Sequence, residues 1–175
     1  MARKVNVIED LNGKKTVFIH DILFKGKRAV NWEEVEKYLR QYVGEFYQIE
    51  DCNKMIYIGS DLPDEYTHSN YTRILKGANA KAKANATQGL PELLKIATNE
   101  VYEDNRKEKH SKDAKYGWYR YDIRFGLPVY DDKTGNLDRY NIFTAILLIK
   151  HSEDGNKYLH DITTIKKETS SPLES

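Results

Sequence analysis

Residues 116–129 constrain the fold more than any other stretch, because their side chains alternate between two chemically different sets. Alternation with a period of two is typical of a β-strand that lays one face on a core. The apolar set is Tyr119, Tyr121, Ile123, Phe125, Leu127 and Val129. The cationic and aromatic set is Tyr116, Trp118, Arg120, Asp122, Arg124 and Pro128. The sequence therefore predicts a long strand with one buried face and one polar face.

The polar face of this strand has two interpretations. Guanidinium groups at every second residue beside an indole ring are suited to phosphate, a carboxylate or a stacked base. Trp118, Arg120 and Arg124 would then form a binding face. The alternative is a solvated sheet face, on which Asp122 pairs with both arginines across one pleat.

Residues 1–60 predict a compact ββαββ unit. A hairpin is expected over 3–24, because Asn12-Gly13 is a strong two-residue turn signal between alternating segments. Asn31 is expected to cap a helix, and two short strands should follow near 46–50 and 54–58. The break over residues 59–69 then separates this unit from the rest of the chain.

Residues 61–175 predict a second unit of helices followed by an antiparallel meander. Helical patterns extend over residues 70–104, and strands are expected over 116–130, 137–151 and 157–167. The last expected helix has its inward side chains at Leu90, Leu93, Leu94, Ile96, Ala97 and Val101. Because helices and strands are segregated, the predicted class is α+β rather than a parallel α/β sheet. Residues 168–175 are expected to form a frayed tail.

The charge balance limits the ways in which the chain can bind nucleic acid. It has 28 basic and 27 acidic residues, a net charge of +1. Any such binding must therefore come from a local patch. An Ala-rich helical segment carries three candidates for such a patch, Lys76, Lys81 and Lys83. These lysines could lie beside a phosphate backbone, and the alternative is a solvated helix face. Lys112, in the basic turn before the long strand, is a further candidate for binding nucleic acid.

Several kinds of site are not indicated by the sequence. Cys52 is the only cysteine, so neither an internal disulfide nor a thiolate zinc cluster is available. No histidine lies four residues from another, and we expect neither a metal nor a cofactor. No stretch approaches the apolar length of a membrane span, so we expect a cytoplasmic protein that does not bind membranes.

Metal-free RNA cleavage is the enzymatic interpretation of the basic residues. It needs a general base near the ribose 2′-hydroxyl and cations that hold the phosphate. His110 would be the base, and Arg120, Arg124 and Lys166 would hold phosphate. His160 is a further histidine on a strand.

Residues 62–174 resemble a domain of the large polyvalent proteins that phages and conjugative elements encode. The segments that carry the likeness are KH, DAK, GWYRY and RF between residues 109 and 125, and IKKETS near the C-terminus. The order of helices and then meander is similar to that of Barnase–EndoU–colicin–RelE-like nuclease domains. The resemblance implies a mobile-element protein that acts against the defences of a host bacterium.

Three functions follow from these observations. The first is an anti-defence protein of the anti-CRISPR kind that binds a host nucleoprotein or its nucleic acid, since Tyr, Trp and Arg dominate binding hot spots. The second is a metal-independent endoribonuclease that acts as a toxin or effector. The third is a structural module without independent activity. The sequence does not fix the oligomeric state.

Overall fold

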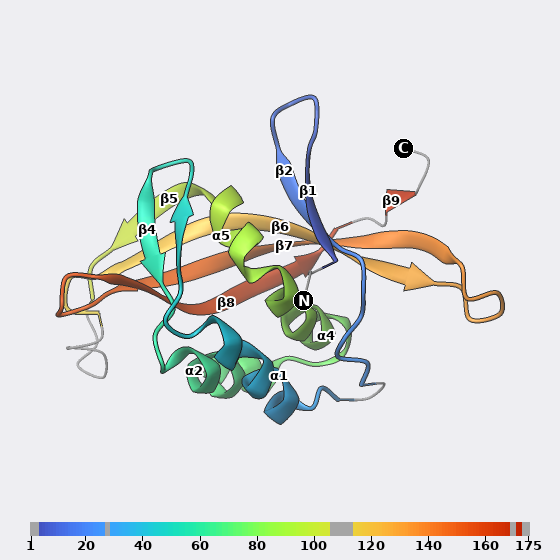
Figure 1. Cartoon of the computed structure of the whole chain (residues 1–175), viewed down its shortest axis with the longest axis horizontal. Helices are drawn as coiled ribbons and strands as arrows, with labels where there is room; N and C mark the ends of the chain where they lie inside the picture. The colour runs from blue at the N-terminus through green and yellow to red at the C-terminus, as the bar shows by residue number, and fades with distance from the viewer. Residues whose placement is uncertain (1–3, 27–28, 106–113, 169–170, 173–175) are drawn as a thin grey trace.

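Three long antiparallel strands form the centre of the protein (Figure 1). The computed structural model describes residues 4–26, 29–105, 114–168 and 171–172. The central strands are β6 (Trp118–Tyr130), β7 (Leu137–His151) and β8 (Lys157–Lys167). β7 pairs with β6 on one side and β8 on the other, both antiparallel. The expected meander is confirmed.

Two hairpins extend this sheet at opposite ends of the strand order. β1 (Val5–Glu9) and β2 (Lys15–Ile19) form the first, and β2 pairs in parallel with β6. β3 (Phe46–Ile49) and β4 (Lys54–Tyr57) form the second, and β4 pairs in parallel with β8. Figure 1 shows both hairpins standing away from the long strands. The elements occur in the expected order, but a separate ββαββ unit is not confirmed, because the central strands lie between the hairpins.

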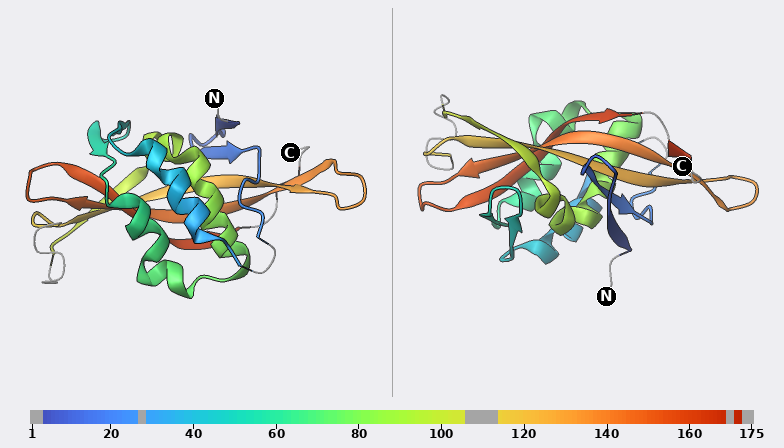
Figure 2. Two further views of the ribbon diagram at one scale, coloured as in Figure 1. Left: turned by 60° about the horizontal axis from the view of Figure 1, so that its bottom comes forward. Right: turned by 90° about the horizontal axis from the view of Figure 1, so that it is seen from above.

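The helices gather on one face of the long strands, as the left view of Figure 2 shows. They are α1 (Trp32–Leu39), η1 (Arg40–Tyr42), α2 (Leu62–His68), α3 (Asn70–Ile74), α4 (Gly77–Ala86), η2 (Thr87–Gly89) and α5 (Leu90–Ile96). α1 begins where expected, since the side chain of Asn31 accepts a hydrogen bond from the Glu33 amide. Its inward residues Val35 and Leu39 are fully buried.

One core of buried side chains includes residues from both halves of the chain. The apolar face of β6 supplies Tyr121, Ile123 and Phe125, and α5 packs Leu93 against them in the same cluster as Val35 of α1. The expected alternation of β6 therefore holds on its apolar side. Elements on both sides of residue 60 share this core and this sheet, so packing does not mark a boundary between the described parts of the two expected units.

The helix expected to run to residue 104 ends early. α5 ends at Ile96, and Thr98–Glu103 forms β5, which pairs with β6. Val101 lies opposite Arg120 and is 57% exposed, so its expected inward position is wrong. The open edge of β6 offers backbone hydrogen bonds to this segment. These hydrogen bonds and the β-favouring residues of the segment together outweigh its local helix propensity.

The expected tail contains β9 (Ser171–Pro172), which pairs with β7.

Candidate binding groove

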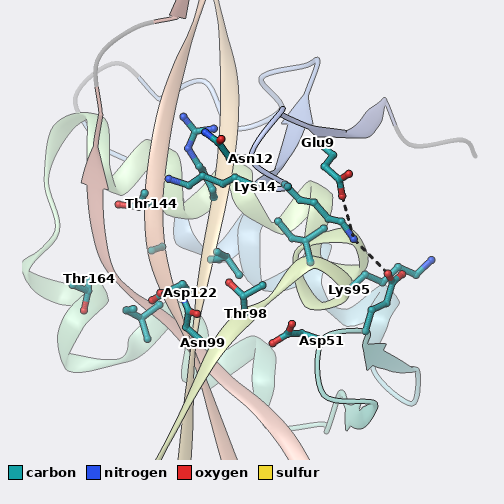
Figure 3. Close-up of a pocket in the computed structure, with 18 of the residues that line it drawn as sticks. Glu9, Asn12, Lys14, Asp51, Lys95, Thr98, Asn99, Asp122, Thr144 and Thr164 are labelled. Atoms are coloured by element: carbon teal, nitrogen blue, oxygen red, sulfur yellow. Dashed lines mark hydrogen bonds and ion pairs between the residues drawn. The ribbon is translucent and has the colours of Figure 1, made fainter.

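A groove of about 1020 Å³ opens above β6, beside the β1–β2 hairpin (Figure 3). β5 pairs with β6 as far as Asp122, whereas β2 pairs with it from Phe125 onward. The edge of β6 at Ile123 and Arg124 therefore lies between these two strands, and the groove opens where they diverge. Its walls are the hairpin tip on one side and the β3–β4 turn, the end of α5 and the start of β5 on the other. Its floor continues across β7 to the end of β8.

The groove carries charged side chains of both signs. The basic residues that line it are Lys14, Lys15, Lys95, Arg124 and Lys166. The acidic residues are Glu9, Glu50, Asp51 and Asp122. These nine groups come from both hairpins, the end of α5 and two of the central strands, β6 and β8, so tertiary packing alone assembles them.

Two of the five cations are already neutralised. Lys15 Nζ lies 4.0 Å from Glu9 Oε1 and 3.7 Å from Glu50 Oε2. Arg124 donates two hydrogen bonds to Glu168 Oε2, from Nε at 3.0 Å and from Nη2 at 2.8 Å.

The other three cations are exposed lysines. They are Lys14, Lys95 and Lys166. None of the three makes an ion pair with another residue in the described ranges. They are therefore the lysines of the groove that are best placed to receive an anion.

Arg124 and Lys166 lie in one row across the floor of the groove. Thr144 of β7 pairs with Arg124 of β6 on one side and with Lys166 of β8 on the other. Neighbouring strands are about 4.8 Å apart, so the two Cα atoms are separated by roughly 10 Å. The structure thus brings together two of the residues that the sequence assigned to phosphate binding.

The three residues of the binding face expected on β6 have different partners. Arg124 lines the groove, but Arg120 Nε lies 3.1 Å from Glu103 Oε2 of β5. The ring of Trp118 packs edge-on against His160, with centroids 5.0 Å apart. Neither Arg120 nor Trp118 lines the groove.

The solvated-face interpretation expected Asp122 to pair with both arginines, and this pairing does not occur among the described residues. Asp122 Oδ2 accepts a hydrogen bond from Asn99 Nδ2 at 2.7 Å. The two arginines instead pair with carboxylates outside β6, on Glu103 and Glu168.

The three lysines expected on one helical patch have different environments. Lys76 is exposed at the start of α4, and Lys81 is half-buried. Lys83 is fully buried and forms an ion pair with Asp161 of β8, so its expected place on a phosphate-binding surface is wrong. The cause is the packing of α4 against β8, which turns this side chain into the interior.

The residues named for RNA cleavage are only partly brought together. His110 and Lys112 lie outside the described residues. His160 is mostly buried, with Nδ1 3.3 Å from Glu65 Oε1. No histidine lines the groove within the described ranges, and no cluster of three or more metal-ligating side chains occurs there.

Lys14 and Lys95 were missed by sequence reasoning. Lys14 follows the Asn12-Gly13 turn directly, and a basic hairpin tip was a usable signal for it. Lys95 had no such signal, because its position at the groove depends on where α5 ends against the sheet.

Comparisons with protein-family models, curated proteins and solved structures give no match to this chain. Among the described helices, none combines the length and apolar character that crossing a membrane requires.

Proposed function

We propose that this chain is a mobile-element anti-defence protein that binds the nucleic acid of a host defence nucleoprotein through the groove above β6. The observation that carries the proposal is the set of three exposed lysines, Lys14, Lys95 and Lys166, that line one groove without an ion pair in the described part of the chain. Lysine ammonium groups bind phosphate as point charges and release counterions from nucleic acid.

The size and charge of the groove support a polymer as the ligand. Its volume of about 1020 Å³ is at the upper end of small-molecule pockets, and it is open to solvent. Local cations are the required source of affinity, because the net charge of the chain is only +1. The carboxylates Glu9 and Glu50 neutralise Lys15, and this leaves the three exposed lysines to contact phosphates.

A charge-reversal experiment tests this proposal. The double variant Lys14→Glu/Lys166→Glu should bind labelled single-stranded and duplex oligonucleotides at least about tenfold more weakly, measured by fluorescence anisotropy at low salt. Lys133→Glu is the matched control, since Lys133 is exposed in the β6–β7 turn, away from the groove. Equal affinities for the wild type and the double variant would exclude the groove as the nucleic-acid site.

A metal-independent ribonuclease is the second candidate. One observation favours it: Arg124 and Lys166, both assigned to phosphate, flank Thr144 on the groove floor. RNA cleavage that persists in EDTA and is lost in His110→Ala would establish this function. Absence of cleavage by the folded protein would leave binding as the activity.

A further inference from the structure

A second surface, at the end of the sheet where β6 begins, carries a row of contacting rings that we call the aromatic strip. It consists of Tyr102, Tyr119, His151 and Tyr116. The ring centroids are 5.1 Å apart for Tyr102 and Tyr119, 6.1 Å for Tyr119 and His151, and 5.1 Å for His151 and Tyr116. Three strands and the turn before β6 therefore contribute to one continuous aromatic surface.

The two end rings of the strip are the most accessible. Tyr102 is 50% exposed and Tyr116 is 45% exposed, whereas Tyr119 and His151 are half-buried. The Tyr102 hydroxyl donates a hydrogen bond of 2.8 Å to the carbonyl oxygen of Tyr116. The contacts between the rings hold the exposed rings in place before any ligand arrives, which lowers the entropy cost of binding.

Lysines surround the strip. Lys54 Nζ lies 4.4 Å from the centroid of the Tyr119 ring and Lys157 Nζ 5.7 Å from it, while Lys115 Nζ is 5.6 Å from the Tyr116 centroid. Lys54 is neutralised by Glu100 at 2.6 Å. Lys115 and Lys157 make no ion pair with any residue of the described ranges. Cations beside exposed rings are the combination that binds the phosphates and bases of an unpaired strand.

The strip and the groove share the strand β5. β5 contributes Thr98 and Asn99 to the groove and Tyr102 to the strip. Across three residues of a strand this is a separation of roughly 10 Å. The groove and the strip are therefore neighbouring sites at the two ends of β5.

We propose that the aromatic strip stacks unpaired bases, so that the ligand of this protein is a single-stranded nucleic acid. This inference rests on the proposed function and specifies its ligand. A protein partner would also be attracted to exposed tyrosines, but the lysines over the rings favour a ligand that carries phosphates between flat apolar groups. Stacking is tolerant of sequence, and it does not require a 2′-hydroxyl.

The test replaces the exposed rings with a side chain of similar bulk and no π-face. Tyr102→Leu/Tyr116→Leu should bind single strands of about 16 nucleotides at least about fivefold more weakly than the wild type, for both oligo-U and oligo-dT. The matched control is Tyr102→Phe/Tyr116→Phe, which keeps both rings and should bind within about twofold of the wild type. Affinity for a duplex of the same length should be equal in all three proteins, and thermal unfolding should verify that each is folded.

A second readout does not depend on the variants. Ultraviolet cross-linking of oligo-U to the wild-type protein, followed by mass spectrometry, should place the adduct on Tyr102 or Tyr116. Cross-links confined to other residues, or full single-strand affinity in the leucine variant, would overturn the strip and leave the groove proposal standing. A wild-type protein that binds no nucleic acid at all would overturn the proposed function and the strip together.

Discussion

Lys83 of α4 and Asp161 of β8 form an ion pair in the interior, although 78 positions separate them in the chain. Their side chains are 0% and 3% exposed. Lys83 Nζ also donates a hydrogen bond of 2.6 Å to Thr72 Oγ1 and lies 4.6 Å from the centroid of the Tyr66 ring. Burial lowers the pKa of Lys83 and raises that of Asp161, while their mutual attraction opposes both shifts. This ion pair therefore stabilises the packing of α4 against β8.

Removal of one partner should destabilise the protein strongly. Lys83→Met leaves the Asp161 carboxylate buried without its cation and should lower the free energy of unfolding by about 3–5 kcal/mol. Urea denaturation measures this change, with the half-buried Lys81→Met of the same helix as control. The double variant Lys83→Met/Asp161→Leu should be more stable than the sum of the single changes predicts. Equal stability of Lys83→Met and Lys81→Met would show that the ion pair does not form.

Asn85 should be the most sensitive uncharged polar residue of α4. Its Oδ1 accepts hydrogen bonds of 3.0 Å from the amides of Leu23 and Phe24, and its Nδ2 donates to the carbonyl oxygens of Phe24 at 3.0 Å and Lys81 at 2.9 Å. Asn85→Ala leaves these groups without partners and should cost about 2–5 kcal/mol of unfolding free energy. The control is Asn79→Ala, also in α4, whose side chain makes no hydrogen bond within the described ranges. Similar melting temperatures for the two variants would contradict the role of Asn85.

Glu65 should make the free energy of unfolding depend on pH in the acidic range. Burial alone would raise its pKa, but His160 and Lys150 outweigh burial, so the pKa lies below the ordinary value of 4.5. The Glu65 carboxylate accepts hydrogen bonds from Lys150 Nζ at 3.0 and 3.2 Å. Because the folded pKa is depressed, this stabilisation is complete above about pH 4.5 and is lost as the pH falls through the folded pKa.

The difference in unfolding free energy between the wild type and Glu65→Gln measures this effect. It should be largest at neutral pH and should narrow below about pH 4.5. A difference that stays constant as the pH falls would mean that Glu65 is not ionised in the folded protein.

The groove lysines should determine the salt dependence of nucleic-acid binding. Each phosphate contact that is removed lowers the slope of log affinity against log salt by about one. Lys14→Gln and Lys166→Gln should therefore each reduce the slope by about that amount, whereas Lys133→Gln should not change it. Identical slopes in all four proteins would indicate that these lysines do not contact phosphate.

Much of the central sheet follows from local patterns. The bounds of β7 and β8 agree with the expected strands, and the apolar alternation of β6 identifies Tyr121, Ile123 and Phe125 as core residues. β5 was not predictable in this way. Its residues continue a helical pattern, and only the open edge of β6 makes the strand conformation more favourable.

The candidate site was predicted less well than the fold. Arg124 and Lys166 were identified because basic side chains on the strands of one sheet can lie in one row. The ion pairs of Arg120 and Lys83 could not be predicted from the sequence. Arg120 pairs with Glu103 and Lys83 with Asp161, and each carboxylate comes from another element of the fold.

The sequence by itself determined which segments form the central strands and which of their faces is apolar, because side-chain alternation is a local property of the chain. Tertiary structure decided the rest. It placed the β1–β2 and β3–β4 hairpins at opposite ends of the strand order, buried Lys83, and left Lys14, Lys95 and Lys166 around one groove. The physical reason is that burial and pairing of a charge depend on which distant carboxylate packs beside it, and a single segment does not contain that information.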